Sequence, residues 1–136
     1  MLFTVLSLLC AMLVRGATVD VKINLWSGTL TCTDDWGGSQ SIAADGLQQA
    51  VEGDVIAVTV SAVSQTASYP QVSLRKTAGW DQFDPAVGVN LQKDAALPYE
   101  ARMTLTADVV DEIKANGFVL TGCGFTATSI DLIHKQ

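Results

Sequence analysis

Short segments in which apolar and polar residues alternate, with turn residues about every ten positions, constrain the fold of this chain most. The clearest is Val55–Val60, a β-branched run that follows the turn residues Glu52-Gly53-Asp54. The other segments that we predict as strands are 23–33, 69–75, 87–91, 99–106, 118–120 and 125–133. Alternation with a period of two places successive side chains on opposite faces of a sheet. The pattern therefore predicts an all-β, antiparallel β-sandwich, and within that class we favour the jelly roll.

Two short helices are expected to interrupt the strands. One covers Ile42–Ala50. The other covers Ala107–Asn116, with Thr106 as its N-cap and Gly117 as the left-handed residue that ends it. The fold class is thus all-β with one or two short helices.

The chain begins with an almost wholly apolar segment, Leu2–Val14. Its length suits the h-region of a signal peptide and is too short to span a bilayer comfortably. We interpret 1–16 as a signal peptide and 17–136 as one domain, and we expect a secreted, periplasmic or cell-surface protein. The alternatives are a lipid anchor on Cys10, which the preceding Leu9 disfavours, and a buried N-terminal strand.

Charge narrows the range of partners. The formal net charge of −6 argues against nucleic acid and against anionic membranes, because both attract basic surfaces. No further segment is apolar over the length that a membrane helix needs. We expect a monomer.

Export would leave Cys32 and Cys123 as an even pair in an oxidising compartment. If 23–33 pairs antiparallel with 125–133, with Leu25 near Asp131, then Cys32 comes close to Cys123. We therefore predict a disulfide between these two residues, worth about 4 kcal/mol in the chain-entropy model. The alternative is two separate buried thiols.

Three tryptophans, Trp26, Trp36 and Trp80, are the leading functional candidates. A flat indole at a loop offers a broad apolar plate with one N–H donor at its rim, which suits stacking on a sugar ring. Trp80 and Trp36 lie in glycine-containing loops, and we predict both as binding plates. The alternatives are a lid on the sandwich for Trp80 and a plug for Trp36. Trp26 is mid-strand and is expected to pack against the sheet or core.

Polar residues alternate along 69–75, where Tyr69, Gln71, Ser73 and Arg75 share one face. Planar amide and guanidinium groups can each engage two neighbouring hydroxyls of a sugar. Asn90 on another strand would extend this face, and Asp81 would add an acceptor beside Trp80. The alternative is an ordinary solvated outer face, which antiparallel sheets commonly have.

A series of short motifs keeps its order through nearly all of 17–136. The motifs are Ile23–Gly28, Asp35–Gly38, Val51–Ile56, Pro70–Leu74, Gly79-Trp80, Tyr99-Glu100, Leu105–Val109, Ala115–Leu120 and Gly124–Thr128. Together they resemble a β-sandwich domain found in secreted glycan-degrading systems of Bacteroidetes. The resemblance implies a jelly roll similar to carbohydrate-binding modules, often appended to glycoside hydrolases or carried by surface glycan-binding proteins. Such domains commonly have Glu after the first tryptophan, whereas this chain has Ser27.

Groups that could carry out catalysis are sparse. The single histidine, His134, lies close to the end of the chain, so no Ser–His or Cys–His arrangement is credible. Asp34, Asp35, Asp81, Asp84 and Glu100 are the carboxylates from which a glycosidase pair could be drawn. We interpret them as surface charges. No zinc spacing or phosphate loop is present, and a structural Ca²⁺ cannot be assigned to particular residues.

We therefore predict a non-catalytic module that binds a polysaccharide, a plant-type β-glucan, mannan or xylan, without a cofactor. The predicted binding residues are Trp80, Trp36, Tyr69, Gln71, Arg75, Asp81 and Asn90. The alternatives are a structural or adhesion module that contacts other proteins and, less favoured, a small glycoside hydrolase.

Overall fold

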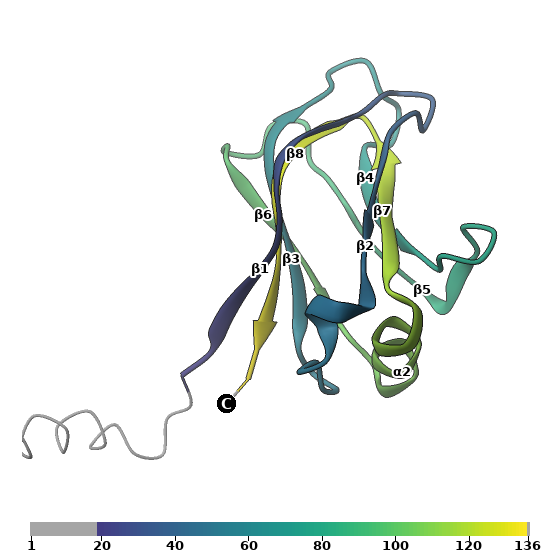
Figure 1. The fold of residues 1–136 in the computed structure, drawn as a ribbon. Helices are drawn as coiled ribbons and strands as arrows, with labels where there is room; N and C mark the ends of the chain where they lie inside the picture. The colour runs from purple at the N-terminus through teal and green to yellow at the C-terminus, as the bar shows by residue number, and fades with distance from the viewer. Residues whose placement is uncertain (1–18, 136) are drawn as a thin grey trace, which may run out of the picture.

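A computed structural model describes residues 19–135. Within these residues, eight strands form two antiparallel sheets that face each other (Figure 1). The first sheet contains, in spatial order, β1 (Val21–Cys32), β8 (Phe125–His134), β3 (Val55–Val63) and β6 (Tyr99–Thr104). The second sheet contains β2 (Ser39–Ile42), β7 (Phe118–Cys123), β4 (Gln71–Arg75) and β5 (Gln82–Asn90). The predicted antiparallel β-sandwich is confirmed.

The strand order is that of a jelly roll. Strands equally far from the middle of the chain pair with each other: β1 with β8, β2 with β7, β3 with β6, and β4 with β5. This order results when one long antiparallel ribbon folds over so that alternate strand pairs enter opposite sheets. The predicted jelly roll is therefore observed.

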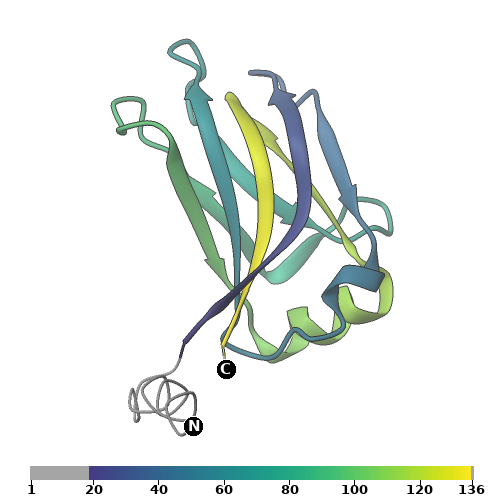
Figure 2. The same cartoon turned by 60° about the vertical axis from the view of Figure 1, so that its left-hand side comes forward.

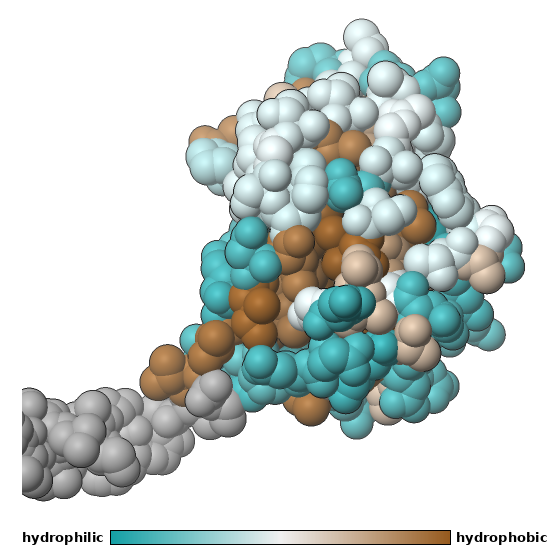
Figure 3. All heavy atoms as spheres, in the orientation of Figure 1, coloured by the Kyte–Doolittle hydropathy of each residue, from teal (hydrophilic) through white to brown (hydrophobic). Residues whose placement is uncertain are grey.

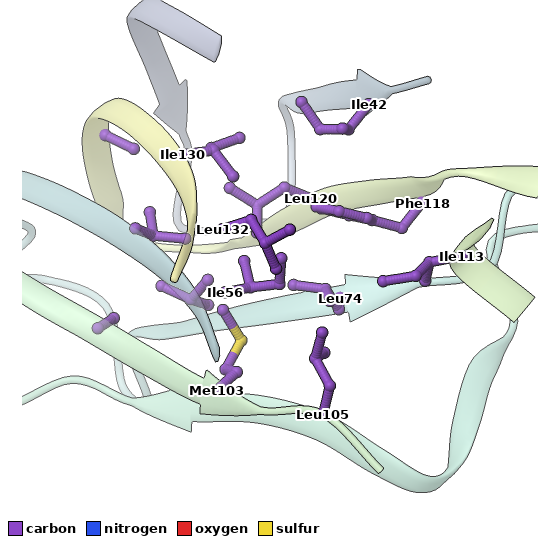
Figure 4. Packing of buried hydrophobic residues seen from close by; sticks show 14 of the residues in the cluster. Ile42, Ile56, Leu74, Met103, Leu105, Ile113, Phe118, Leu120, Ile130 and Leu132 are labelled. Atoms are coloured by element: carbon purple, nitrogen blue, oxygen red, sulfur yellow. The ribbon is translucent and has the colours of Figure 1, made fainter. Parts of the chain in front are cut away.

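The core lies between the sheets and is filled by the inward residues of the alternating strands. Figure 4 shows Ile56, Leu74, Leu120 and Leu132 pointing toward one another from strands of both sheets. Each of these four side chains is fully buried. Burying one aliphatic side chain of this size contributes about 1.5–3 kcal/mol, so the pairing of inward faces dominates the stability of the fold.

A bulge in β1 sets the position of Trp26. Asn24 pairs with Asp131 and Trp26 pairs with Ile130, so Leu25 is an extra residue without a partner on β8. The bulge lets Leu25 and Trp26 both pack, partly buried, against the core cluster. Figure 3 shows hydrophobic atoms gathered between the two sheets on the side of β1 and β2. The structure thus agrees with the packing role expected for Trp26.

Helix α2 (Ala107–Asn116) lies at one end of the sandwich (Figures 1 and 2) and has the predicted bounds. The Thr106 hydroxyl accepts the N–H of Val109 at 3.4 Å, as an N-cap does. Gly117 ends the helix with φ 75° and ψ −164°, so its φ is positive but it is not a left-handed helical residue. Its N–H donates to the Ile113 carbonyl at 2.8 Å.

The helix predicted over Ile42–Ala50 is wrong. Ile42 is the last residue of β2 and pairs with Phe118, and only a short 3-10 helix, η1 (Ala44–Leu47), follows. Gly46 disfavours a longer helix. One turn is enough to bury the Leu47 side chain completely. Strand β2 was not predicted because its residues Ser39-Gln40-Ser41 show no apolar alternation.

The predicted signal peptide, residues 1–16 with Cys10, lies outside the described residues. Among the residues that are described, no helix combines the length and the hydropathy needed to cross a membrane.

Candidate functional site

The polar residues of β4 lie on the outer face of the second sheet. Val72 and Leu74 are fully buried on the inner face, so Gln71, Ser73 and Arg75 point outward. Gln71 pairs with Asn90 of β5 on one side and with Cys123 of β7 on the other. We call this outer face, together with the aromatic residues that border it, the platform; it comprises Trp36, Tyr69, Gln71, Ser73, Arg75, Trp80 and Asn90.

Trp36 is presented by the β1–β2 loop, residues 33–38. Figure 1 shows this loop and the β3–β4 loop at the end of the sandwich away from α2. The loop is closed internally by bonds from the Thr33 N–H to the Gly37 carbonyl, at 2.7 Å, and from the Trp36 N–H to the Thr33 carbonyl, at 3.1 Å. The Cys123 thiol donates to the Asp34 carbonyl at 3.1 Å and ties the loop to β7. Trp36 itself has φ 68° and a side chain that is 37% exposed.

Trp80 is presented by the tight turn between β4 and β5. The Asp81 N–H donates to the Ala78 carbonyl at 3.3 Å, and the two central residues, Gly79 and Trp80, have φ of 66° and 57°. Positive φ at both central positions is the mark of a type I′ hairpin turn, for which glycine is well suited. Trp80 occupies the second central position and is 46% exposed.

Arg75 connects the two tryptophans. Its Nε–H donates to the Ser73 hydroxyl at 2.8 Å, and its Nη1 donates to the Trp80 carbonyl at 3.3 Å. Its Cζ lies 5.3 Å from the centroid of the Trp36 ring, within the range of a cation–π interaction. Ser73, which we expected on the exposed ladder, is only 7% exposed and is engaged by Arg75.

Two neighbouring hollows open beside Tyr69, which is 78% exposed. The smaller, of about 290 Å³, is lined by Trp36, Gln71, Asp34 and Cys123 together with residues 66–69. The other, of about 460 Å³, is lined by Asn90 and residues 91–94 together with residues 68–70. Ser68 and Tyr69 line both hollows, so these two residues lie where the hollows meet.

Asp34, which the sequence predicted only as a surface charge, is a further candidate. It lines the smaller hollow beside Trp36 and accepts a hydrogen bond from the Thr66 hydroxyl. Hydrogen bonds from Thr66 and Ser64 hold the pKa of Asp34 below its usual range, so it is an ionised acceptor at neutral pH. Its position two residues before Trp36 in the sequence was the one available signal, since Thr66 comes from another loop.

Asp81 follows Trp80 in the turn and, like Trp80 and Arg75, lines neither of these hollows. Its carboxylate folds over the turn, with Oδ1 3.6 Å from where a Cβ of Gly79 would stand. A larger hollow, of about 740 Å³, lies on the other side of the Trp36 loop. Its one aromatic residue, Phe125, is only 3% exposed, so this hollow has no exposed plate for stacking.

The structure does not show the predicted Cys32–Cys123 disulfide, and both residues are buried free thiols in it. The expected strand pairing does form, with Cys32 opposite Phe125, whereas Cys123 is the last residue of β7 in the second sheet. Cys32 belongs to the core cluster, whereas Cys123 lines the smaller hollow of the platform. The Cys32 thiol donates to the Gly38 carbonyl at 3.5 Å, and the Cys123 thiol donates to the Asp34 carbonyl.

The carboxylates considered for catalysis do not form one site. Glu100 lies on β6 of the first sheet, 3.0 Å from the Lys22 ammonium and 2.8 Å from the Arg102 guanidinium. The hydrogen bond from Lys22, together with that from Arg102, keeps the pKa of Glu100 low, which is unfavourable for a general acid. Asp81 precedes β5 of the second sheet. Among residues 19–135, no cluster of histidine, cysteine, aspartate and glutamate has the grouping of a metal site.

No family model matches this chain. No curated protein matches it either. Among solved structures, it is similar to the SGBP-B protein of the mixed-linkage glucan utilization locus of Bacteroides ovatus, determined in complex with a mixed-linkage heptasaccharide. The TM-score is 0.60 at 24% sequence identity, and the match covers 82% of this chain and 29% of the other. The chain thus spans less than a third of that protein, and the likeness shows that the two share a fold.

Proposed function

We propose that this protein is a non-catalytic carbohydrate-binding module that holds a polysaccharide on the platform. The observation that carries the proposal is that Trp36 and Tyr69 line one hollow beside the outer face of a sheet, with the exposed Trp80 in the turn whose carbonyl Arg75 bonds. Exposed aromatic rings beside one solvated face suit the stacking of sugar rings. The shared fold with a protein solved in complex with a heptasaccharide supports the same reading.

The ligand class that we propose is a plant-type polysaccharide, and of β-glucan, mannan and xylan we place β-glucan first because the similar structure holds a mixed-linkage oligosaccharide. Trp36, Trp80 and Tyr69 would stack on sugar rings. Gln71 and Asn90, which are neighbours across β4 and β5, would bond hydroxyl groups. Asp34 would accept hydroxyl hydrogens at the edge of the smaller hollow.

The test is isothermal titration of the protein with mixed-linkage glucan, mannan and xylan oligosaccharides. Modules of this kind bind weakly, so we expect a binding free energy of about −4 to −8 kcal/mol, which corresponds to millimolar to micromolar affinity. Trp80→Ala is expected to lower affinity about tenfold to a hundredfold, since one stacking plate is a large share of so small a total. Gln71→Ala is expected to weaken the binding free energy by about 1–2 kcal/mol, because hydrogen bonds to sugar hydroxyls are lost.

Arg102→Gln, on the outer face of the first sheet, is the matched control and should leave affinity unchanged. Normal binding by Trp80→Ala together with early melting would show that this indole is structural. Binding to none of the three glycans would reject the proposed ligand class.

We also propose that the bound glycan is not cleaved. Incubation with any glycan that the protein retains should release no reducing sugar. Turnover that disappears in Asp81→Ala or Glu100→Ala would contradict this and would make the protein a glycoside hydrolase.

One observation favours a second candidate function, contact with another protein. Val19 and Val21 at the start of β1 are 66% and 38% exposed. Apolar atoms also gather between the sheets on that side of the molecule (Figure 3). An exposed apolar patch can serve as an interaction surface. If this is its role, Val21→Asp would abolish self-association or partner capture in light-scattering and pull-down experiments without changing glycan affinity.

Export of the protein is part of the same proposal. A polysaccharide-binding module acts where the polymer is, and the apolar start of the chain has the character of a signal peptide. Protein recovered from an expressing cell should begin near Ala17 when its intact mass is measured. Recovery of the full-length chain from the cytoplasm would contradict export.

A further inference from the structure

Arg75 makes its described contacts with the platform itself. Its Nε–H bonds the Ser73 hydroxyl, its Nη1 bonds the Trp80 carbonyl, and its guanidinium lies over the Trp36 ring. Among residues 19–135, no carboxylate lies within ion-pair distance of Arg75. Arg102, by contrast, is paired with Glu100 at 2.8 Å. The guanidinium of Arg75 is therefore committed to the two tryptophan-bearing loops rather than to a salt bridge.

Both tryptophans that Arg75 contacts are held in an unusual backbone conformation. Trp36 has φ 68° and Trp80 has φ 57°, and they are the two residues other than glycine with positive φ among those described. A bulky residue in this region costs free energy and persists only where its surroundings fix it. The two strained positions belong to different loops, and Arg75 is a contact that they share.

We infer that Arg75 is a positioning residue, one that fixes Trp36 and Trp80 at a single separation before ligand arrives; this rests on the proposed glycan-binding function. A ligand that meets two plates already in place does not have to order them, so the affinity is higher. Only a planar guanidinium can stack on one indole while donating in two other directions. An ammonium at the same position has no planar face, and its donors radiate from one atom.

A direct contact between Arg75 and the ligand makes a different prediction. Nη2 has no hydrogen-bond partner among the described residues, and no buried side-chain nitrogen or oxygen is left unpaired. Nη2 is therefore not fully buried and is the donor of Arg75 that remains for a ligand. If Arg75 acted through this group alone, its loss would weaken binding without disturbing the indoles of the free protein.

The experiment compares the full chain with Arg75→Gln and Arg75→Lys, and uses Arg102→Gln as the matched control. Near-ultraviolet circular dichroism and tryptophan fluorescence are recorded without ligand, and affinity is measured with a mixed-linkage β-glucan heptasaccharide. We expect both Arg75 variants to change the ligand-free spectra and to bind about tenfold more weakly, with no rescue by lysine. Arg102→Gln should match the wild type in both measurements.

A double-mutant cycle separates positioning from direct contact. Trp36→Ala is introduced into the wild type and into Arg75→Gln. If Arg75 positions Trp36, then Trp36→Ala lowers glycan affinity much less in the Arg75→Gln background than in the wild type, because that indole is already displaced. An equal loss of affinity in both backgrounds, with unchanged ligand-free spectra for Arg75→Gln, would overturn the inference and leave the proposed function intact. Absence of binding by the wild type would instead count against the proposed function, while the ligand-free spectra would still decide whether Arg75 orders the indoles.

Discussion

Trp80 occupies a backbone conformation that residues other than glycine rarely adopt, with φ 57° in the turn between β4 and β5. The left-handed region costs a residue with a Cβ about 1–2 kcal/mol relative to glycine. The turn could have been built more stably with glycine at this position. An exposed indole at this position is therefore consistent with a role of the side chain in binding rather than in stability.

Because of this backbone conformation, two substitutions that remove the indole should differ in stability but not in binding. Trp80→Gly and Trp80→Ala both remove the indole, so both should lose glycan affinity to the same extent. Trp80→Gly should be more stable than Trp80→Ala by about 1 kcal/mol, because only glycine relieves the positive φ. Thermal and urea melts of the two variants measure the difference. A more stable alanine variant would show that residue 80 is not held in this conformation.

At the scale of elements, the end of β8 is fastened to the turn before β3 by a buried carboxylate. Asp54 is fully buried and accepts hydrogen bonds from the N–H groups of Val51 and Lys135, both at 3.0 Å. The Nδ1 atom of His134 lies 2.7 Å from its Oδ2. Burial by itself would raise the pKa of Asp54, but these hydrogen bonds outweigh burial and lower it.

The lowered pKa predicts how the stability of this junction depends on pH. A carboxyl with a folded pKa below its unfolded value contributes stability above the unfolded pKa, near 4, and loses it as the pH falls through the folded pKa. Unfolding free energy should therefore decline as the pH falls below about 4. Asp54→Asn should cost about 2–3 kcal/mol at pH 7 and should flatten this decline. Urea melts from pH 7 to pH 3 provide the measurement; an unchanged acid decline in Asp54→Asn would refute the assignment.

The bulge of β1 gives a second prediction at this scale. The Trp26 ring packs against the core cluster and lies over Gly28, where a Cβ would stand 2.8 Å from Cζ2. Trp26→Ala should lower stability by about 2 kcal/mol, less than for a fully buried tryptophan, and leave glycan affinity nearly unchanged. Melting temperature and titration on one sample distinguish the two effects. A large loss of affinity at unchanged melting temperature would move Trp26 into the binding site.

For the whole molecule, the reactivity of the two thiols measures whether the sandwich is folded. Cys32 and Cys123 are both buried. Burial, together with the neighbouring Cys123, raises the pKa of Cys32 to about 11. Burial likewise raises the pKa of Cys123, and the charges of Asp34 and Asp35 add to this effect. Protein beginning at Ala17 should therefore react slowly with a thiol reagent when native and at both cysteines in denaturant without reductant. Absence of free thiol in the denatured, unreduced protein would show that Cys32 and Cys123 form a disulfide.

Local sequence determined much of this fold, because its signals act over a few residues. The alternation of Val72 and Leu74 with Gln71, Ser73 and Arg75 fixed which face of β4 is buried. Thr106 and Gly117 marked both ends of α2 through hydrogen bonds to residues three or four positions away. Strand β5 was expected over 87–91 but begins at Gln82, since it is an edge strand in which Pro85 is tolerated.

Tertiary structure alone decided which residues from distant parts of the sequence come into contact. Strand β2 has no alternation of its own and exists because β7 offers it backbone partners. Cys32 ends β1 and Cys123 ends β7, and only the closed sandwich brings both thiols to carbonyls of the loop between β1 and β2. The contact of Arg75 with Trp36 joins a strand to a distant loop. A sequence pattern records which face a side chain takes, whereas its neighbours on that face come from strands brought together only when the two sheets close.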